Sequence, residues 1–350
     1  MDKNLTMISP GGYSTLIGRF GGCPESPDGR LLVYTRKYSL ENDATGVWVC
    51  ATDLTGHRKL YDARSGNHNS VQATFVDNDR IVFVDGAGGV SSICVLNLRT
   101  GDVEQKIAGR AGHRARRGKF PFCLGGAGAA VYWFDCYTGE TEKLFDTASL
   151  AGAMVRAGFP NEPGLRTRTF SHLQLNPSAD KIMMRIGDVL GCRDLKTGEF
   201  FFIPNKPVHQ LWYDDNSYMA MDQPHDGERF FMEASRMNRY AVTGEIIEAL
   251  GGIGNHMDGS PDRRYFTADT MFLGEAIRIN LYQKGVLEPL AELDAHRFDK
   301  TAWEHKVHSN PTFSADGRRV YFNRPVSDEK TVAVFADISA YIQKKDGPQS

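Results

Sequence analysis

The chain of 350 residues exceeds the length of most single domains, but all-β propellers and α/β barrels reach this length as one unit. Hydrophobic residues make up 41% and charged residues 24% of it, which is ordinary globular composition and excludes an intrinsically disordered protein. The 41 Lys and Arg residues nearly balance the 43 Asp and Glu residues, so no overall positive field would draw the chain to nucleic acid or an anionic membrane.

The N-terminal stretch 1–12 lacks the continuous apolar segment of a secretory signal, and no later stretch approaches the roughly 18 to 20 apolar residues of a membrane helix. We therefore expect a cytoplasmic protein with no membrane partner. The six cysteines form no C-x-x-C pair and several lie in apolar runs, so we expect buried, reduced thiols in preference to a zinc site or a disulfide framework. They are Cys23, Cys50, Cys94, Cys123, Cys136 and Cys192.

A turn followed by a β-branched and aromatic run recurs along the chain. Pro, Asp and Gly favour the tight turn, and the apolar run after them favours a strand. The copies are 26–34, 76–84, 176–184, 214–221, 260–266 and 314–322. A recurrence at intervals of 40 to 50 residues is typical of propellers, in which each unit forms one blade.

Thr-Gly turns mark the same units a second time. Successive glycines, counted from Gly56 through the weaker copy at Gly285, lie 45, 38, 59, 46 and 41 residues apart. With a C-terminal unit that ends near 335–337 the count is seven, or about 50 residues per unit in a chain of 350. We predict an all-β, seven-bladed β-propeller, with residues 1–350 as a single domain of blades of roughly 40–55 residues. Six blades remain open, because the unit at 124–139 lacks the Asp-Gly turn.

Extra length lies between units three and four, at about 149–169, and between units six and seven, at about 286–306. Within the second insertion, residues 290–296 can form a short helix or a loop over one face. The loops on one face of a propeller's channel commonly carry its site, so the two insertions are the first places to look for one.

Four of the ten histidines precede the turn at the equivalent place in successive units: His172, His209, His256 and His308. In a propeller this strand lines the central channel, so the four imidazoles are expected to share one pocket. Imidazole is a common ligand of divalent transition metals and a base near neutral pH. His305 precedes His308 by three residues and adds to the set, while His68 holds the corresponding slot in an early unit and can reach the channel rim.

Other patterns are less specific. The basic run 110–119 could grip an acidic ligand, but it has no interleaved aromatics and is more typical of a solvated loop, the interpretation we adopt. His57 and His225 are interpreted as surface-turn residues. No G-x-S-x-G segment is present, so serine hydrolysis has no support.

The histidine segments resemble those of the oligogalacturonate lyases. This family consists of seven-bladed propellers that cleave short pectic uronides by β-elimination with a bound divalent metal, typically manganese. The resemblance covers roughly the C-terminal half of the chain. Its segments are Ser171-His172-Leu173, His209-Gln210-Leu211-Trp212, Asn255-His256-Met257 and 305–313. It implies an acidic oligosaccharide as substrate and no nucleic acid partner.

The resemblance also implies roles for individual residues. His209 matches the family's catalytic base, and His256 and His308 match two metal ligands. His305 stands where the family has Gln and Asn310 where it has His; both residue types can bind a metal. The family's catalytic arginine lies upstream of the base segment, where Arg185 and Arg193 are both candidates. Should His209 not be the base, His172 is the remaining channel histidine.

Two alternatives stay open. The chain can be a non-catalytic propeller that binds a saccharide or a protein, with its histidines as struts between blades. It can also be a lyase for a different uronide polymer, because the departures at His305 and Asn310 fall among the metal ligands.

Overall fold

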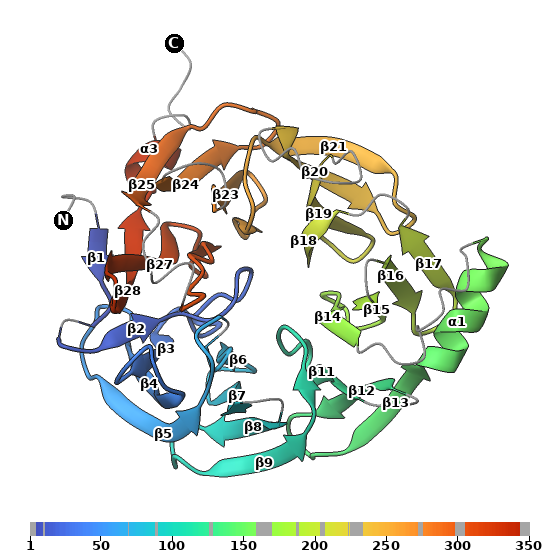
Figure 1. The fold of residues 1–350 in the computed structure, drawn as a ribbon, viewed down its shortest axis with the longest axis horizontal. Helices are drawn as coiled ribbons and strands as arrows, with labels where there is room; N and C mark the ends of the chain where they lie inside the picture. Colours follow the sequence, from blue (N-terminus) through green and yellow to red (C-terminus); the bar gives the residue numbers. More distant parts are fainter. Residues whose placement is uncertain are drawn as a thin grey trace.

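A computed structural model describes most of the chain. The described residues are 5–9, 11–68, 70–87, 90–125, 129–158, 170–186, 189–203, 207–222, 224, 234–271, 276–297 and 305–343. Within them, strands form seven antiparallel sheets of four strands each, arranged as a ring around a central channel (Figure 1). The predicted seven-bladed β-propeller is therefore confirmed, and six blades are excluded.

Each of the first six blades runs in chain order from the channel to the rim. The strands of blades one to three are β2 (Ser14–Leu16), β3 (Leu31–Lys37), β4 (Ala44–Ala51), β5 (Arg58–Arg64); β6 (Thr74–Phe75), β7 (Arg80–Ala87), β8 (Val90–Asn97), β9 (Val103–Ala108); β10 (Arg110–Ala111), β11 (Lys119–Leu124), β12 (Ala130–Asp135), β13 (Thr141–Asp146). Blades four to six are β14 (Phe170–Leu175), β15 (Lys181–Ile186), β16 (Val189–Asp194), β17 (Phe200–Ile203); β18 (Val208–Trp212), β19 (Ser217–Asp222), β20 (Arg236–Ala241), β21 (Ile246–Gly251); β22 (Met257–Gly259), β23 (Tyr265–Asp269), β24 (Ala276–Gln283), β25 (Ala291–Arg297).

The seventh blade closes the ring by combining the two ends of the chain. Its strands are β26 (Thr312–Phe313), β27 (Arg319–Ser327), β28 (Lys330–Asp337) and, at the rim, β1 (Leu5–Met7). Leu5 pairs with Ala336 and Met7 with Val334, so both termini lie on this blade, as Figure 1 shows. This pairing covers a sheet edge that would otherwise be open.

The two repeated turns have distinct places in a blade. The Ser-Pro-Asp-Gly type joins the innermost strand to the second, and the Thr-Gly type joins the third to the rim strand. In the first type, Gly29 and Gly317 have φ of 70° and 73°, the left-handed region in which glycine is favoured. Arg263 takes the same place in blade six with φ of 58°.

The core lies in layers between neighbouring blades. One cluster joins blades four, five and six through Met183, Tyr240 and Phe266, and another joins blades one and two through Val47 and Phe83. The channel end of the first cluster is closed by Phe20, which is 3% exposed. All six cysteines are unpaired, as expected, and burial raises the pKa of the Cys50 thiol to about 12.

Two sequence-based interpretations are corrected by the structure. Residues 290–296 form no helix, because 291–296 belong to rim strand β25. The basic run 110–119 is no free loop: it begins with inner strand β10, and the His113 backbone N–H donates to the Leu173 carbonyl of blade four.

The described helices are α1 (Thr147–Arg156) and α3 (Ser339–Gln343). Helix α1 begins after Asp146, whose carboxylate accepts from the Ser149 N–H, and occupies the start of the first insertion. The remainder of that insertion, 159–169, and residues 298–304 of the second lie outside the described residues, as does His225. Neither α1 nor α3 has the length and apolar character needed to cross a membrane.

Candidate active site

The inner strands of blades four and five turn a histidine toward the channel by the same backbone device. The register of β14 with β15 shifts between Ser171 and Gln174, and that of β18 with β19 shifts between Val208 and Leu211. His172 and His209 lie inside these bulges, and both have φ of 54°. A bulge re-aims a side chain, and a non-glycine residue in this region costs on the order of 1–3 kcal/mol. The fold therefore accepts strain to place these two imidazoles.

Four imidazoles lie in sequence along the channel wall. The ring centroids of His68 and His308 are 4.1 Å apart, those of His308 and His256 4.8 Å, and those of His256 and His209 4.5 Å. Phe20 lies against the inner side, with its ring 5.3 Å from both His209 and His256. The predicted convergence of histidines from different blades is thus confirmed for these residues, including His68, which is exposed.

A hydrogen-bonded chain fixes His256. Its Nδ1 lies 2.9 Å from Asp269 Oδ2, and its Nε2 lies 3.1 Å from His308 Nδ1. Because a carboxylate accepts, Nδ1 of His256 carries a proton, and Nε2 is the ring nitrogen that faces His308. A carboxylate behind a histidine is the arrangement that orients a metal-binding imidazole. His256 is 2% exposed, so its orientation is held by the surrounding protein.

His209 differs from His256 in having no such partner. Its Nδ1 is buried and makes no hydrogen bond within the described part of the chain. Burial, reinforced by His256 and His172, holds the pKa of His209 well below the ordinary value of 6.5. The imidazole is therefore neutral at physiological pH and able to accept a proton.

His172 and His113 form a second group of channel histidines. Their ring centroids are 6.4 Å apart, and the His113 ring is 5.6 Å from that of Phe20. Burial lowers the pKa of His172 to about 2 and that of His113 well below 6.5, with Arg19 adding to both shifts. The sequence analysis missed His113 because it lies in the run interpreted as a solvated loop; its only signal was its place before the strand of unit three.

The two candidate arginines lie in different surroundings. Arg185, on β15, donates to the Pro207 carbonyl and to Gln210 Oε1 at 3.3 Å, and its charge contributes to lowering the pKa of His172 and His209. Arg193, on β16, donates to the Leu144 carbonyl and lies 4.9 Å from the Phe200 ring toward the rim. The structure therefore brings Arg185, and not Arg193, to the histidines.

Arg19 is a channel cation that the sequence analysis did not single out. Its guanidinium lies 5.4 Å from the Phe20 ring, and burial followed by the charge of Arg110 lowers its pKa to about 9. Its charge contributes to lowering the pKa of His209 and His308 as well. An arginine in a segment without a repeat motif gives no sequence signal, and only the ring closure brings it to the histidines.

The predicted metal ligands are only partly brought together. Two nitrogens bound to one ion at about 2.1 Å each lie about 3 Å apart, and His256 Nε2 and His308 Nδ1 are 3.1 Å apart. The other two predicted ligands contact other residues. His305 Nε2 lies 3.7 Å from Glu41 Oε1, and Asn310 Nδ2 donates to the Gly18 carbonyl at 3.4 Å. Among the described residues, no group of three or more His, Cys, Asp or Glu side chains has the arrangement of a metal site.

The fold is shared with solved structures. An oligogalacturonate lyase in complex with manganese matches with a TM-score of 0.68 and 12% identity, over 97% of this chain and 96% of that chain. A second oligogalacturonate lyase, from Vibrio parahaemolyticus, matches with a TM-score of 0.69 and 12% identity, over 96% and 94%. The Cps50 (Swd1) β-propeller domain of Myceliophteria thermophila matches with a TM-score of 0.59 and 10% identity, over 95% and 99%.

These likenesses bear out, for the fold, the resemblance that the histidine segments suggested. No protein-family model matches the sequence, and a comparison with curated proteins also gives no match. At identities this low, the chemistry has to be argued from the residues in the channel.

Proposed function

We propose that this protein is a lyase that cleaves uronic-acid-containing oligosaccharides by β-elimination, with His209 as the general base. The observation that carries the proposal is His209 itself: a buried, neutral imidazole with an unpartnered ring nitrogen, 4.5 Å from the ring of His256 and beside channel cations. The neighbouring cations favour an anionic ligand. To react, that ligand has to place its acidic proton within reach of the His209 ring nitrogen. The fold shared with two oligogalacturonate lyases supports the same reaction.

The channel cations supply the second requirement. The C5 proton of a uronide lies beside a carboxylate, whose negative charge opposes the further charge that develops when the proton leaves. Arg185 and Arg19 are the channel guanidinium groups that lower the pKa of His209 by their charge, and we assign them to the substrate carboxylate. The same charges that keep His209 neutral would therefore hold the substrate.

A divalent metal, such as manganese, fits the donors of this site. We assign it to His256 and His308, oriented by Asp269; His305 and Asn310 would join as further ligands only by leaving their contacts with Glu41 and Gly18. When bound, it would neutralise charge that develops on the substrate carboxylate. His209 remains outside this set, because a base must keep its lone pair for the proton.

The proposed reaction proceeds by transfer of one proton and loss of one bond. His209 takes the C5 proton, the electrons of the C5–H bond form a C4=C5 double bond, and the C4–O4 bond breaks. The leaving oxygen takes a proton from water, and His209 then releases its own. Phe20, packed against both His209 and His256, excludes water from that side of the base.

The test is a screen of uronide oligosaccharides for new ultraviolet absorbance. The unsaturated product of elimination must absorb, whereas a product of hydrolysis cannot. We expect absorbance to grow with at least one uronide and to stop when the metal is chelated. Saccharide cleavage without new absorbance, or no cleavage of any uronide by metal-loaded protein, would contradict the proposal.

A non-catalytic propeller that binds a saccharide or protein is the second candidate. It is favoured by the hydrogen-bonded series Asp269–His256–His308. Each of these hydrogen bonds forms without any ligand, as in a histidine that only links two blades. The metal content of the purified protein separates the two candidates. Stoichiometric metal supports the lyase, and a protein that binds none when metal is supplied supports the strut.

A further inference from the structure

A polar cavity lies along the channel beyond His172 and His209. Along each inner strand the histidine comes first and the cavity residues follow it: Gln174 after His172, and Trp212 after His209. The cavity has a volume of about 180 Å³, which is the size of a small organic molecule. His113 lines it, but His209, His256 and His308 do not, so the cavity is distinct from the proposed lyase site.

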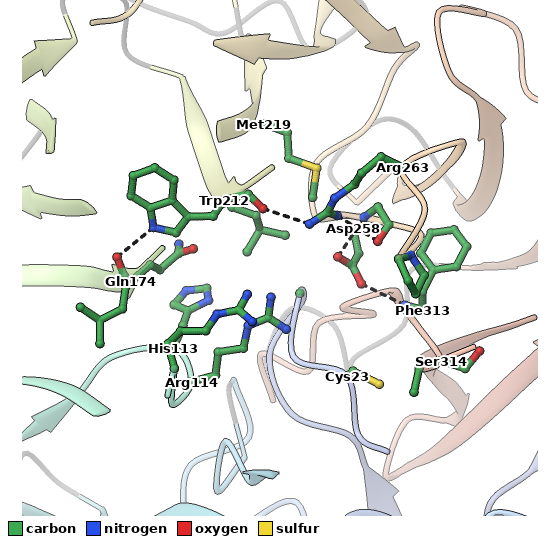
Figure 2. Close-up of a pocket in the computed structure, with 17 residues that line it drawn as sticks. Cys23, His113, Arg114, Gln174, Trp212, Met219, Asp258, Arg263, Phe313 and Ser314 are labelled. Atoms are coloured by element: carbon green, nitrogen blue, oxygen red, sulfur yellow. Dashed lines mark hydrogen bonds between the residues drawn. The ribbon is translucent and has the colours of Figure 1, made fainter. Parts of the chain in front are cut away.

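Positive charge dominates the lining. Arg114, Arg116 and Arg263 border the cavity, and Figure 2 shows Arg114 and Arg263 approaching its centre from different blades. Asp258 is the one carboxylate among the described residues that line it. Its Oδ2 already accepts from the Thr312 hydroxyl at 2.8 Å and from the Phe313 N–H at 2.9 Å, so its hydrogen bonds are directed into the fold.

Among the described residues, no hydrogen bond joins Arg114 or Arg116 to a carboxylate, although the charge of Asp258 acts on both arginines. Arg114 makes no hydrogen bond or ion pair within the described part of the chain, and Arg116 Nε is buried without a hydrogen-bond partner there. Burial, reinforced by the charges of Arg114 and Arg263, lowers the pKa of Arg116 to about 8. Cations that are desolvated and placed beside one another are unfavourable unless an anion joins them.

Arg263 is placed here against the preference of its own backbone. It has φ of 58° at the turn position that Gly29 and Gly317 fill in other blades, where a non-glycine residue costs on the order of 1–2 kcal/mol. Its guanidinium donates to the carbonyls of Tyr213, Gly259 and Trp212, at 3.1–3.2 Å. These three hydrogen bonds fix the guanidinium at the cavity wall. All three acceptors are carbonyls, so none of them neutralises its charge.

Part of the remaining wall is apolar. Trp212 donates its Nε1 proton to the Gln174 carbonyl at 3.0 Å, which locks the indole ring beside Leu211 and Met219. Cys23 also borders the space, but burial raises the pKa of its thiol to about 12, so it carries no reactive thiolate. A cationic side facing an apolar side suits a small molecule with one charged end and one non-polar face.

We propose that this cavity binds a small oxyanion, the carboxylate of a sugar acid or a phosphate group, with Arg114 and Arg116 as its ligands. A bidentate guanidinium contact is the geometry that both oxyanions favour. This binding is independent of the proposed elimination, because the histidine end supplies none of its ligands.

The test compares anions at constant ionic strength. Thermal unfolding and titration calorimetry are run with sodium phosphate, sodium galacturonate, neutral galactose and sodium chloride, on the wild type and on Arg114→Met. We expect a saturable rise in Tm with phosphate or galacturonate and none with galactose or chloride. In Arg114→Met, the Kd should weaken by about tenfold or more. The anion that binds more tightly identifies the source of the oxyanion.

Two controls keep the test decisive. Arg117→Met removes a neighbouring but exposed arginine that does not line the cavity, and it should leave binding unchanged. His209→Ala should also leave it unchanged, which separates this proposal from the lyase mechanism.

In chloride alone, Arg114→Met should have a Tm equal to or above the wild type, because it removes charge repulsion. Should it unfold, Arg114→Lys, which keeps the charge, replaces it and is expected to bind more weakly than the wild type.

No saturable effect of either anion on the wild type would overturn the proposal. An equal loss of binding in Arg114→Met and Arg117→Met would overturn it as well, because the anion would then be attracted only by the general surface charge.

Discussion

The histidine end and the arginine end of the channel are formed by the same inner strands, yet they hold their polar groups in different ways. At the histidine end, His256 is tied to Asp269 and His308, and burial lowers the pKa of His209 and His308, so both of these are neutral. At the arginine end, Arg114 and Arg116 are desolvated, and neither has a hydrogen bond to a carboxylate among the described residues. Burial of a neutral imidazole costs little free energy, whereas burial of neighbouring cations is unfavourable, and a bound anion would offset that cost. One end is thus suited to proton transfer and the other to capture of charge.

Among the residues around the proposed base, the largest expected effect concerns the proposed metal ligands. His256→Ala removes one imidazole of the facing pair, and we expect activity on the uronide to fall by about 10²–10³ as metal content is lost. Activity and metal content should be measured on the same preparation. His57→Ala is the matched control, because His57 lies in the turn before β5 and bonds Tyr34 at 3.0 Å, away from the channel histidines. Full metal occupancy in His256→Ala would contradict the assignment.

The next largest effect concerns Asp269, the carboxylate that bonds the proposed ligand His256. Asp269→Asn keeps the shape of the side chain but removes the charge that fixes the proton of His256 on Nδ1. We expect metal affinity to weaken by about 10–100-fold, with a change in Tm of only a few degrees. A competition titration against a metal-binding dye measures the affinity. Unchanged affinity would show that Asp269 is only a strut.

The histidine end should also make the fold sensitive to acid. Burial holds the pKa of His113 well below 6.5, so below pH 6.5 the unfolded chain binds a proton that the folded chain does not. Stability therefore falls as the pH falls below 6.5, with a slope of at most about 1.4 kcal/mol per pH unit for this residue. Urea unfolding of the wild type and His113→Gln at pH 7 and pH 5 measures this. A wild type and variant with the same loss between the two pH values would contradict it.

The smallest effect measures what the backbone of Arg263 costs. Gly29 has φ of 70° in the equivalent turn, and a Cβ added there would meet nothing within 4 Å, so Gly29→Ala isolates the conformational term. We expect the free energy of unfolding to fall by about 1–2 kcal/mol. An unchanged value from urea unfolding would mean that the left-handed position of Arg263 carries no cost.

Much of this architecture could be predicted from local sequence. The turns near Gly29 and Gly317 and the Thr-Gly turns depend on residues within each unit, which is why the blade count was correct. The histidine convergence followed from equal positions in successive units, and His256 and His308 do lie together.

The errors arise where distant residues decide the structure. Residues 290–296 have helix-compatible spacing, but Asp294 is held at 2.9 Å by both His296 and Arg324, and this strand-to-strand contact has no local signal. The run with Arg114 and Arg116 has the composition of a solvated loop, because a segment that lines a polar cavity need not be apolar. Arg19 reaches the histidines only through closure of the ring.

The central claim is tested most directly by the turnover of His209→Ala on the uronide that the wild type cleaves, with bound metal measured on the same sample. Elimination by this base predicts a loss of kcat of about 10²–10⁴-fold, with metal content and Tm close to those of the wild type. A variant that stays active, or one that loses its metal together with its activity, would contradict the claim and move the role of base to His172.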